Sequence, residues 1–265
     1  MDRKTVVITG AGGGIGAALA KQYASAGYNL SLLDINKGAA DETTALCVAL
    51  GVGAIALECD VTSLEACDAA IMETLAKFRA VDVLIANAGV THLSLFEETD
   101  VTVLRRVMEV NFFGAVNITK SALPELLKSQ GQIIAMSSVA GFCPLPMRTG
   151  YAASKYAVRG FFETLRSENR HRGLDVLVVC PSYVDTNIGD NALGGDGEKA
   201  THQRQEAEGG MTADDAAAKI HRAAERRLDF LPVAKGARLA HLLSRLSPAW
   251  LERISTKRIL DQLED

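Results

Sequence analysis

A run of glycines close to the amino terminus constrains the fold of this chain more than any other feature. Five of the seven residues from Gly10 to Gly16 are glycine. The apolar run Lys4 to Thr9 before them predicts a buried β-strand, and the stretch from Ala17 to Ala26 after them predicts a helix. Glycine allows a ligand to approach the backbone closely, and the start of a helix attracts a phosphate. The pattern predicts a pyrophosphate site, and the alternative is a flexible glycine loop.

A second apolar run, Asn29 to Asp34, ends in a carboxylate where an acid that holds an adenosine ribose is expected. Asp34 would accept hydrogen bonds from both ribose hydroxyls and would repel a 2′-phosphate. Only Lys37 could offset that repulsion. We therefore expect NAD as the cofactor and NADP to be disfavoured. The alternative is that Asp34 only caps the helix that follows it.

A phenol and an amine lie one helical turn apart in the segment Tyr151-Ala-Ala-Ser-Lys155. A unit charge at about 4 Å, with an effective dielectric constant of about 20, is worth about 4 kcal/mol. That is an upper estimate of roughly three pKa units, because burial of either group would reduce it. Lys155 is thus expected to lower the pKa of Tyr151 toward the range in which an acid or base works best. On its own the spacing is also typical of a solvated helix.

The chain from about Lys4 to Thr186 resembles the short-chain dehydrogenase/reductase family, with the family's motifs in their usual order and spacing. These motifs are Thr9-Gly10-x-x-x-Gly14-Ile15-Gly16, Asn87-Ala88-Gly89, Asn111, Ser138 and Tyr151-x-x-x-Lys155. The segment Gly210-Met211-Thr212 is weakly similar to the branch with steroid- and retinoid-type reductases. Taken singly, each motif has an ordinary structural explanation, such as a strand-end turn for Asn87.

The resemblance implies a role for four polar residues. Tyr151 would exchange the hydroxyl proton, and Lys155 would lower its pKa and hold the nicotinamide ribose. Ser138 would steady the substrate oxygen, and Asn111 would hold a water for proton relay. The function implied is hydride transfer between NAD(H) and a secondary alcohol or ketone. The alternative is a dinucleotide-sensing or scaffold protein on the same fold.

The resemblance also implies which residues contact the bound molecules. The cofactor residues are Gly10, Gly13, Gly14, Ile15, Gly16, Asp34, Asp60, Val61, Asn87, Ala88, Gly89, Tyr151, Lys155, Pro181, Val184 and Thr186. The substrate residues are Ser138, Tyr151 and Tyr183, and the hypothetical wall residues Leu145, Met147, Tyr183 and Leu193 indicate a partly apolar substrate. One departure is that Pro181-Ser182 replaces the more usual Pro-Gly, so the backbone there is less free.

Strand and helix patterns alternate along the chain, with further strands predicted at 54–59, 81–86, 133–136 and 175–179. This alternation predicts a single α/β domain over residues 1–265, a doubly wound (Rossmann) parallel sheet flanked by helices, with a C-terminal helical extension. Ligands bind such sheets beyond the carboxyl ends of the strands. Residues 187–212 are rich in glycine and polar residues, and we expect them to form a substrate lid.

The tail at 234–265 is predicted to be helical and basic, with leucines at helical spacing. A helix packed on the body or on another subunit is the favoured interpretation, and attachment to an anionic membrane surface is the alternative. The family likeness implies a homodimer or homotetramer, with subunits pairing around Asn111 and Phe161-Phe162.

Composition and charge narrow the remaining classes. The net charge of −4 argues against nucleic-acid binding. The five cysteines lack Cys-x-x-Cys pairing and the five histidines lack ligand spacing, so we expect reduced thiols and no metal. Met1 to Lys4 leads straight into a strand, and we therefore expect no signal peptide and a cytoplasmic location.

Overall fold

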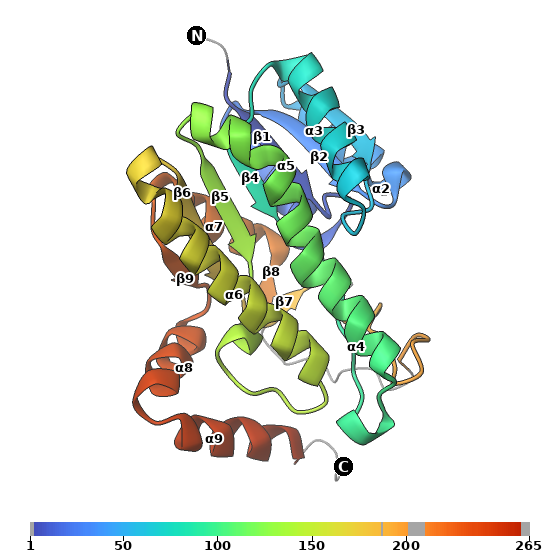
Figure 1. The fold of residues 1–265 in the computed structure, drawn as a ribbon, viewed down its shortest axis with the longest axis vertical. Coiled ribbons are helices and arrows are strands. Elements are labelled where there is room, and N and C mark those ends of the chain that lie inside the picture. The colour runs from blue at the N-terminus through green and yellow to red at the C-terminus, as the bar shows by residue number, and fades with distance from the viewer. Residues whose placement is uncertain (1–2, 187, 201–209, 261–265) are drawn as a thin grey trace.

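The centre of the molecule is a seven-stranded sheet in which every pair of neighbouring strands is parallel (Figure 1). The computed structural model describes residues 3–186, 188–200 and 210–260. The strand order is β3-β2-β1-β4-β5-β6-β9. The strands are β1 (Thr5–Thr9), β2 (Asn29–Asp34), β3 (Ala54–Glu58), β4 (Val83–Ala86), β5 (Gln132–Met136), β6 (Asp175–Cys180) and β9 (Phe230–Pro232).

Helices cover both faces of this sheet, and each face has its own apolar core. The helices are α1 (Gly14–Ser25), α2 (Lys37–Ala49), α3 (Leu64–Phe78), α4 (Val101–Met108), α5 (Gly114–Lys128), α6 (Thr149–Asn169), α7 (Ala213–Glu225), α8 (Lys235–Leu246) and α9 (Pro248–Leu260). One core is shared by α1, α2 and α7, and the other by α3, α5 and α6. In Figure 1, α5 and α6 lie in front of the sheet and α7 lies behind it.

The position of the ligand crevice follows from the strand order. β1 pairs with β2 on one side and β4 on the other, so the direction of winding reverses between β1 and β4. Parallel strands buried on both faces are continuously apolar, and all five residues of β1 and all five of β5 are buried. The crevice beyond the carboxyl ends of β1 and β4 is therefore the expected ligand site.

The predicted fold class is confirmed, and the predicted strands lie within two residues of the observed ones. Helix α1 begins at Gly14, inside the glycine run, three residues before the predicted start at Ala17. β9 was not predicted, because three residues that end in a proline give little strand pattern; proline is tolerated there since β9 is an edge strand.

The segment predicted to be a lid is only partly described. Residues 187 and 201–209 of the predicted 187–212 lie outside the described residues. Beside this segment, a two-stranded sheet joins β7 (Val184–Asp185) to β8 (Met211–Thr212). In the described part of the segment, Leu193 exchanges backbone hydrogen bonds with Thr91 and Leu93, and the Asp100 amide donates to the Gly195 carbonyl. The described part is thus bonded to the 91–100 loop, and its role as a lid stays a prediction.

Candidate functional site

The glycine turn joins β1 to α1 in a conformation that other residues adopt poorly. Gly10 has φ 63° and Gly14 has φ 52°, both in the left-handed region. A Cβ on Gly16 would overlap the Gly10 carbonyl oxygen, and a Cβ on Gly10 would lie 2.9 Å from the Ala88 Cα. The absence of side chains at Gly10 and Gly16 therefore lets the turn fold back on itself. Gly13 is exposed and its backbone is extended, and a Cβ there would meet open space. Its contact with a ligand remains a prediction.

The end of β4 holds this turn in place. The Asn87 side-chain amide donates to the carbonyls of Thr9 (2.9 Å) and Gly10 (3.1 Å). In return, the buried Thr9 hydroxyl accepts the amides of Asn87 (3.0 Å) and Ala88 (3.1 Å). These four bonds join the first residue of the turn to the end of the neighbouring strand, so Asn87 has a structural role whichever ligand binds.

Asp34, at the end of β2, directs its carboxylate at the same turn. Its Oδ2 accepts the Gly12 amide at 2.8 Å, and its Oδ1 accepts the Asn36 amide at 2.9 Å. The helix-cap interpretation of Asp34 is wrong, because Asn36 is the N-cap of α2 and accepts the Ala39 amide. Asp34 therefore lies beside the glycine turn, which is where a carboxylate that binds the adenosine ribose of a dinucleotide is expected.

Asp60 and Val61 follow β3 on the far side of β2. The Asp60 Oδ1 accepts both the amide (2.9 Å) and the hydroxyl (2.8 Å) of Thr62, which is a turn built on an aspartate. Val61 is buried, and its carbonyl accepts the Asn117 side-chain amide at 3.0 Å. The structure therefore fixes the backbone of Val61 at the carboxyl end of the sheet.

Helix α6 carries both Tyr151 and Lys155 past the carboxyl end of β5. Lys155 is 4% exposed as a whole residue, and its amine donates to the Met136 carbonyl at 2.9 Å, while the Ser137 hydroxyl donates to the Lys155 carbonyl at 2.8 Å. A Cβ on Gly141 would overlap the Ser137 hydroxyl, so Gly141 makes room for this contact. These two reciprocal bonds fix the register of α6 against β5. Ser137 was missed in the sequence, because its role depends on a partner 18 residues away.

Lys155 lies near the Tyr151 ring, with the amine nitrogen 5.7 Å from the ring centre. Burial lowers the pKa of Lys155 to about 8, against a smaller opposing effect of Cys180. The amine is therefore largely protonated at neutral pH, although its pKa lies closer to neutrality than the pKa of an exposed lysine. Tyr151 itself is half-buried on the same face.

Ser138 follows directly after Ser137 and begins a short 3-10 turn, η3 (Val139–Gly141). Its hydroxyl accepts the Ala140 amide at 3.1 Å, which leaves the hydroxyl proton available for another acceptor. The Val139 amide donates to the Pro181 carbonyl at 2.9 Å, so the ends of β5 and β6 are joined next to Ser138.

Asn111 occupies a π-helical turn, η2 (Glu109–Phe113), between α4 and α5. Such turns are frequent at functional sites. The buried Asn111 side chain accepts the Val90 amide at 2.8 Å and donates to the Val90 carbonyl and the Ser154 hydroxyl, both at 2.9 Å. A Cβ on Gly89 would lie 3.0 Å from the Asn111 Oδ1 and 3.5 Å from the Lys155 amine. Gly89 thus leaves space beside both side chains.

The segment after β6 passes the start of α1. Pro181 and Val184 are buried, Tyr183 and Thr186 are half-buried, and the Thr186 hydroxyl donates to the Val184 carbonyl at 3.4 Å. A Cβ on Gly14 would lie 3.2 Å from the Thr186 methyl. An open groove of about 340 Å³ is lined there by Gly14, Lys21, Thr186, Asp214 and their neighbours. The structure therefore places Thr186 next to the glycine turn.

These residues fit a dinucleotide. A pyrophosphate needs backbone amides at a helix start with no side chain in the way, and α1 begins at Gly14 directly after the exposed Gly13, where a Cβ would meet open space. The adenosine ribose needs a carboxylate beside that turn, which Asp34 supplies. In the part of the chain that the structure describes, no group of three His, Cys, Asp or Glu side chains could hold a metal ion.

Comparison with known proteins identifies the family. Residues 4–194 match the sequence model of the short chain dehydrogenase family. The chain belongs to this family.

Two curated relatives and one solved structure illustrate the similarity. The mouse dehydrogenase/reductase SDR family member 7B is 34% identical over 259 residues, which cover 96% of this chain and 80% of the mouse protein. The 11-beta-hydroxysteroid dehydrogenase 1A of Arabidopsis thaliana is 36% identical over 203 residues, covering 76% of this chain and 58% of the plant protein. A Burkholderia phymatum short chain dehydrogenase/reductase, solved in complex with NAD, has a TM-score of 0.81 and 29% identity and covers 92% and 95% of the two chains.

The predicted family is thus confirmed, together with the similarity to the steroid-type branch. This short-chain dehydrogenase brings Ser138, Tyr151, Lys155 and Asn111 to one region around the carboxyl ends of β4 and β5. Their catalytic roles stay predictions. Sequence reasoning missed Ser154, whose hydroxyl donates to the Tyr151 carbonyl at 2.7 Å, although its place inside the Tyr151–Lys155 motif was a signal.

Proposed function

We propose that this protein transfers a hydride between NAD(H) and a secondary alcohol or ketone of partly apolar character. The chain belongs to a family of oxidoreductases, and the specific reaction is the proposal. It is supported by one observation above all: the buried Lys155 amine lies 5.7 Å from the centre of the Tyr151 ring. A buried cation at that distance favours the phenolate form of the tyrosine.

The proton chemistry follows from the side chains. In oxidation, the Tyr151 phenolate accepts the proton of the substrate hydroxyl, and in reduction the phenol donates it to the carbonyl oxygen. The Ser138 hydroxyl, which accepts the Ala140 amide and keeps its own proton available, donates a hydrogen bond to the same substrate oxygen. The nicotinamide, when bound, supplies the hydride acceptor or donor. Lys155 keeps its charge near Tyr151 at pH values below about 8.

The choice of NAD rests on Asp34. Both oxygens of this carboxylate accept backbone amides, and those bonds fix its position beside the glycine turn. A 2′-phosphate placed there would meet a fixed negative charge. The ribose hydroxyls of NAD would instead find two hydrogen-bond acceptors.

An apolar substrate is supported by the loops around Tyr151. The Met147 carbonyl accepts the Ser94 amide at 3.0 Å, and Leu193 pairs with His92, so the two loops with these apolar side chains meet at the 91–94 segment. The relative from Arabidopsis is named as a hydroxysteroid dehydrogenase, and a cyclic secondary alcohol of similar character is the substrate class we propose to test first. A homo-oligomer and a cytoplasmic location belong to the same proposal.

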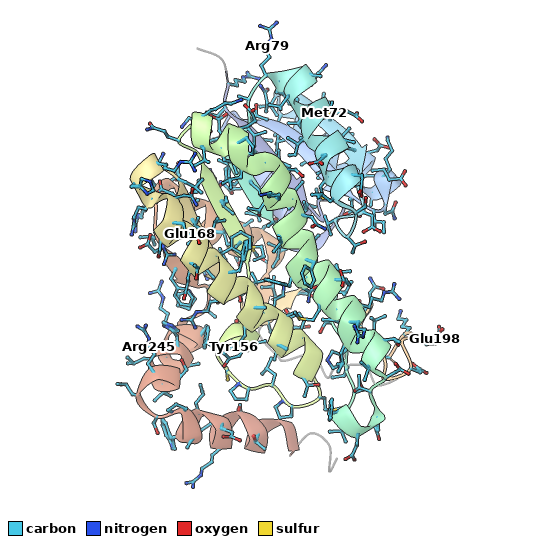
Figure 2. The ribbon with its side chains drawn as sticks, in the orientation of Figure 1. Met72, Arg79, Tyr156, Glu168, Glu198 and Arg245 are labelled. Atoms are coloured by element: carbon cyan, nitrogen blue, oxygen red, sulfur yellow. The ribbon has the colours of Figure 1, made fainter. Side chains whose placement is uncertain are left out.

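The test compares two tyrosines on the same helix. Tyr151→Phe should retain NAD binding, measured by calorimetry, and reduce kcat on a panel of cyclic secondary alcohols by about 10²–10⁴-fold. Tyr156→Phe is the matched control, because Tyr156 lies five positions along α6 and is 47% exposed (Figure 2). Near-normal turnover of Tyr151→Phe would contradict the role of Tyr151. If the unaltered protein binds NAD and oxidises no alcohol on the panel, the sensor alternative is the better description.

A further inference from the structure

Helices α8 and α9 pack on the body through one side only. Ala237 of α8 and Leu251 of α9 are buried, and Ala240 and Leu243 pack against the same apolar core as α6. The His241 ring lies against the Phe230 ring, with centroids 4.4 Å apart and the ring planes tilted by 34°. These contacts confirm part of the favoured interpretation of the tail, that it packs on the body. They also determine which side of α8 faces away from the protein.

The side of α8 that faces away is apolar. Leu239, Leu242 and Leu246 recur at a spacing of three and four residues and are 60%, 53% and 73% exposed. This spacing puts them on one stripe, opposite Ala237 and Ala240. Helix α9 begins two residues after α8 ends and adds Trp250 and Ile254, which are also about half exposed. We call these five residues the outer apolar face.

Basic residues accompany the outer apolar face. From Lys235 to Leu260 there are six Lys or Arg and one acid, Glu252, within a chain whose net charge is −4. Arg238 and Arg245 are exposed, and they lie along one edge of the leucine stripe. Figure 2 shows Arg245 at the outer side of α8, and Figure 1 shows α8 and α9 at the end of the molecule far from the N-terminus.

The charge decides between the two surfaces that could cover such a face. A symmetric contact with a second copy would lay the face on itself and bring Arg238 and Arg245 opposite their own copies. An anionic bilayer has the opposite charge and also accepts apolar side chains. Tryptophan is enriched at the membrane–water interface, which suits the position of Trp250. Among the described residues, no helix is long and apolar enough to cross a bilayer, so the contact would lie in the plane of the interface.

We propose that the outer apolar face of α8 and α9 binds an anionic membrane surface, with its leucines at the acyl boundary and its arginines among the headgroups. This inference does not depend on the catalytic proposal. The two interpretations of the tail are then compatible, because one side of α8 and α9 packs on the body and the proposal concerns the other side.

The chain of 265 residues is tested by flotation with vesicles of phosphatidylcholine, with and without 30 mol% phosphatidylserine. Recovery with the anionic vesicles should exceed recovery with the neutral ones at least about tenfold, and it should fall as salt is raised. Leu239→Glu/Leu242→Glu/Leu246→Glu should abolish flotation. The matched control is Leu46→Glu/Leu50→Glu on and beside α2, which are similarly exposed.

Thermal unfolding and NAD binding are measured for every variant, so that a misfolded protein is recognised. Arg238→Gln/Arg245→Gln, a second and milder variant, should lower recovery on anionic vesicles by about tenfold. Equal recovery of the leucine variant and the unaltered protein would overturn the proposal. A failure of the unaltered protein to float would also overturn the proposal. If light scattering then shows that the leucine variant loses dimers, the face binds a second copy of the chain.

Discussion

The buried ring of His92 accepts a hydrogen bond from the first turn of the helix that carries Tyr151 and Lys155. The Gly150 amide donates to the His92 Nε2 at 2.9 Å, and the Nδ1 lies 3.3 Å from the Ser94 hydroxyl. Because Nε2 is the acceptor, the neutral ring carries its proton on Nδ1. The N-cap residue of α6, Arg148, offers no side-chain cap to that turn. His92 therefore replaces the usual cap from another part of the chain.

His92→Leu removes this acceptor at similar bulk and leaves a buried amide unsatisfied. Such a loss costs about 1–3 kcal/mol of unfolding free energy. Gly150 precedes Tyr151 directly, so we also expect kcat to fall by roughly 10- to 100-fold through misplacement of the phenol. The dissociation constant of NAD should stay the same, since His92 makes none of the contacts of the glycine turn.

His92→Gln separates the cap from mere packing, because its amide oxygen can reach the position of Nε2. Urea unfolding and steady-state kinetics are compared for the Leu and Gln variants. We expect Gln to restore most of the lost stability and kcat. If Gln is as impaired as Leu, or if Leu is as stable and active as the unaltered protein, the capping argument is refuted.

The burial of His92 should also make the stability of the folded protein depend on pH. Burial, and then the charge of Arg148, lower the pKa of His92 below its usual value of 6.5. At pH values under 6.5 the unfolded chain binds a proton that the folded chain resists, so stability falls as the pH is lowered. Burial lowers the pKa of His221 and His241 in the same direction, so His92→Gln should remove only part of the slope.

Three further outcomes are expected. Gly16→Ala should weaken NAD binding and destabilise the protein, measured by calorimetry and thermal unfolding, because its Cβ would overlap the Gly10 carbonyl oxygen; Gly236→Ala, where a Cβ meets open space, is the control. Asp34→Asn should raise the NADP-to-NAD ratio of kcat/KM at least about tenfold, and an unchanged ratio would exclude charge repulsion as the basis of selectivity. Lys155→Met should move the acidic limb of the pH–rate profile of alcohol oxidation, on which the rate rises as Tyr151 deprotonates, to higher pH, and an unshifted limb would show that the amine does not act on Tyr151.

Much of the fold could be predicted because its signals are local. Each of the strands β1 to β4 is a short apolar run that a turn follows. In the glycine turn after β1, the left-handed backbone at Gly10 and Gly14 favours glycine. Three features were not predictable in this way. β9 is too short to give a strand pattern, the side chain of Asn111 in the π-helical turn bonds to Val90, 21 residues away, and the cap of α6 comes from a histidine 58 residues before Gly150.

The electrostatics of the site show why spacing alone was insufficient. From the sequence, Tyr151 and Lys155 were expected to interact as two groups on one helix, with a large pull of the cation on the phenol. In the structure the amine is nearly inaccessible and donates to the Met136 carbonyl. Burial strengthens the interaction between the two groups, since solvent screens it less. The same burial lowers the pKa of Lys155 to about 8, so the cation itself is lost in the alkaline range where an unburied lysine would persist. We therefore expect the effect of Lys155 on Tyr151 to weaken at a lower pH than the effect of an exposed lysine would, because burial lowers the pKa of its amine.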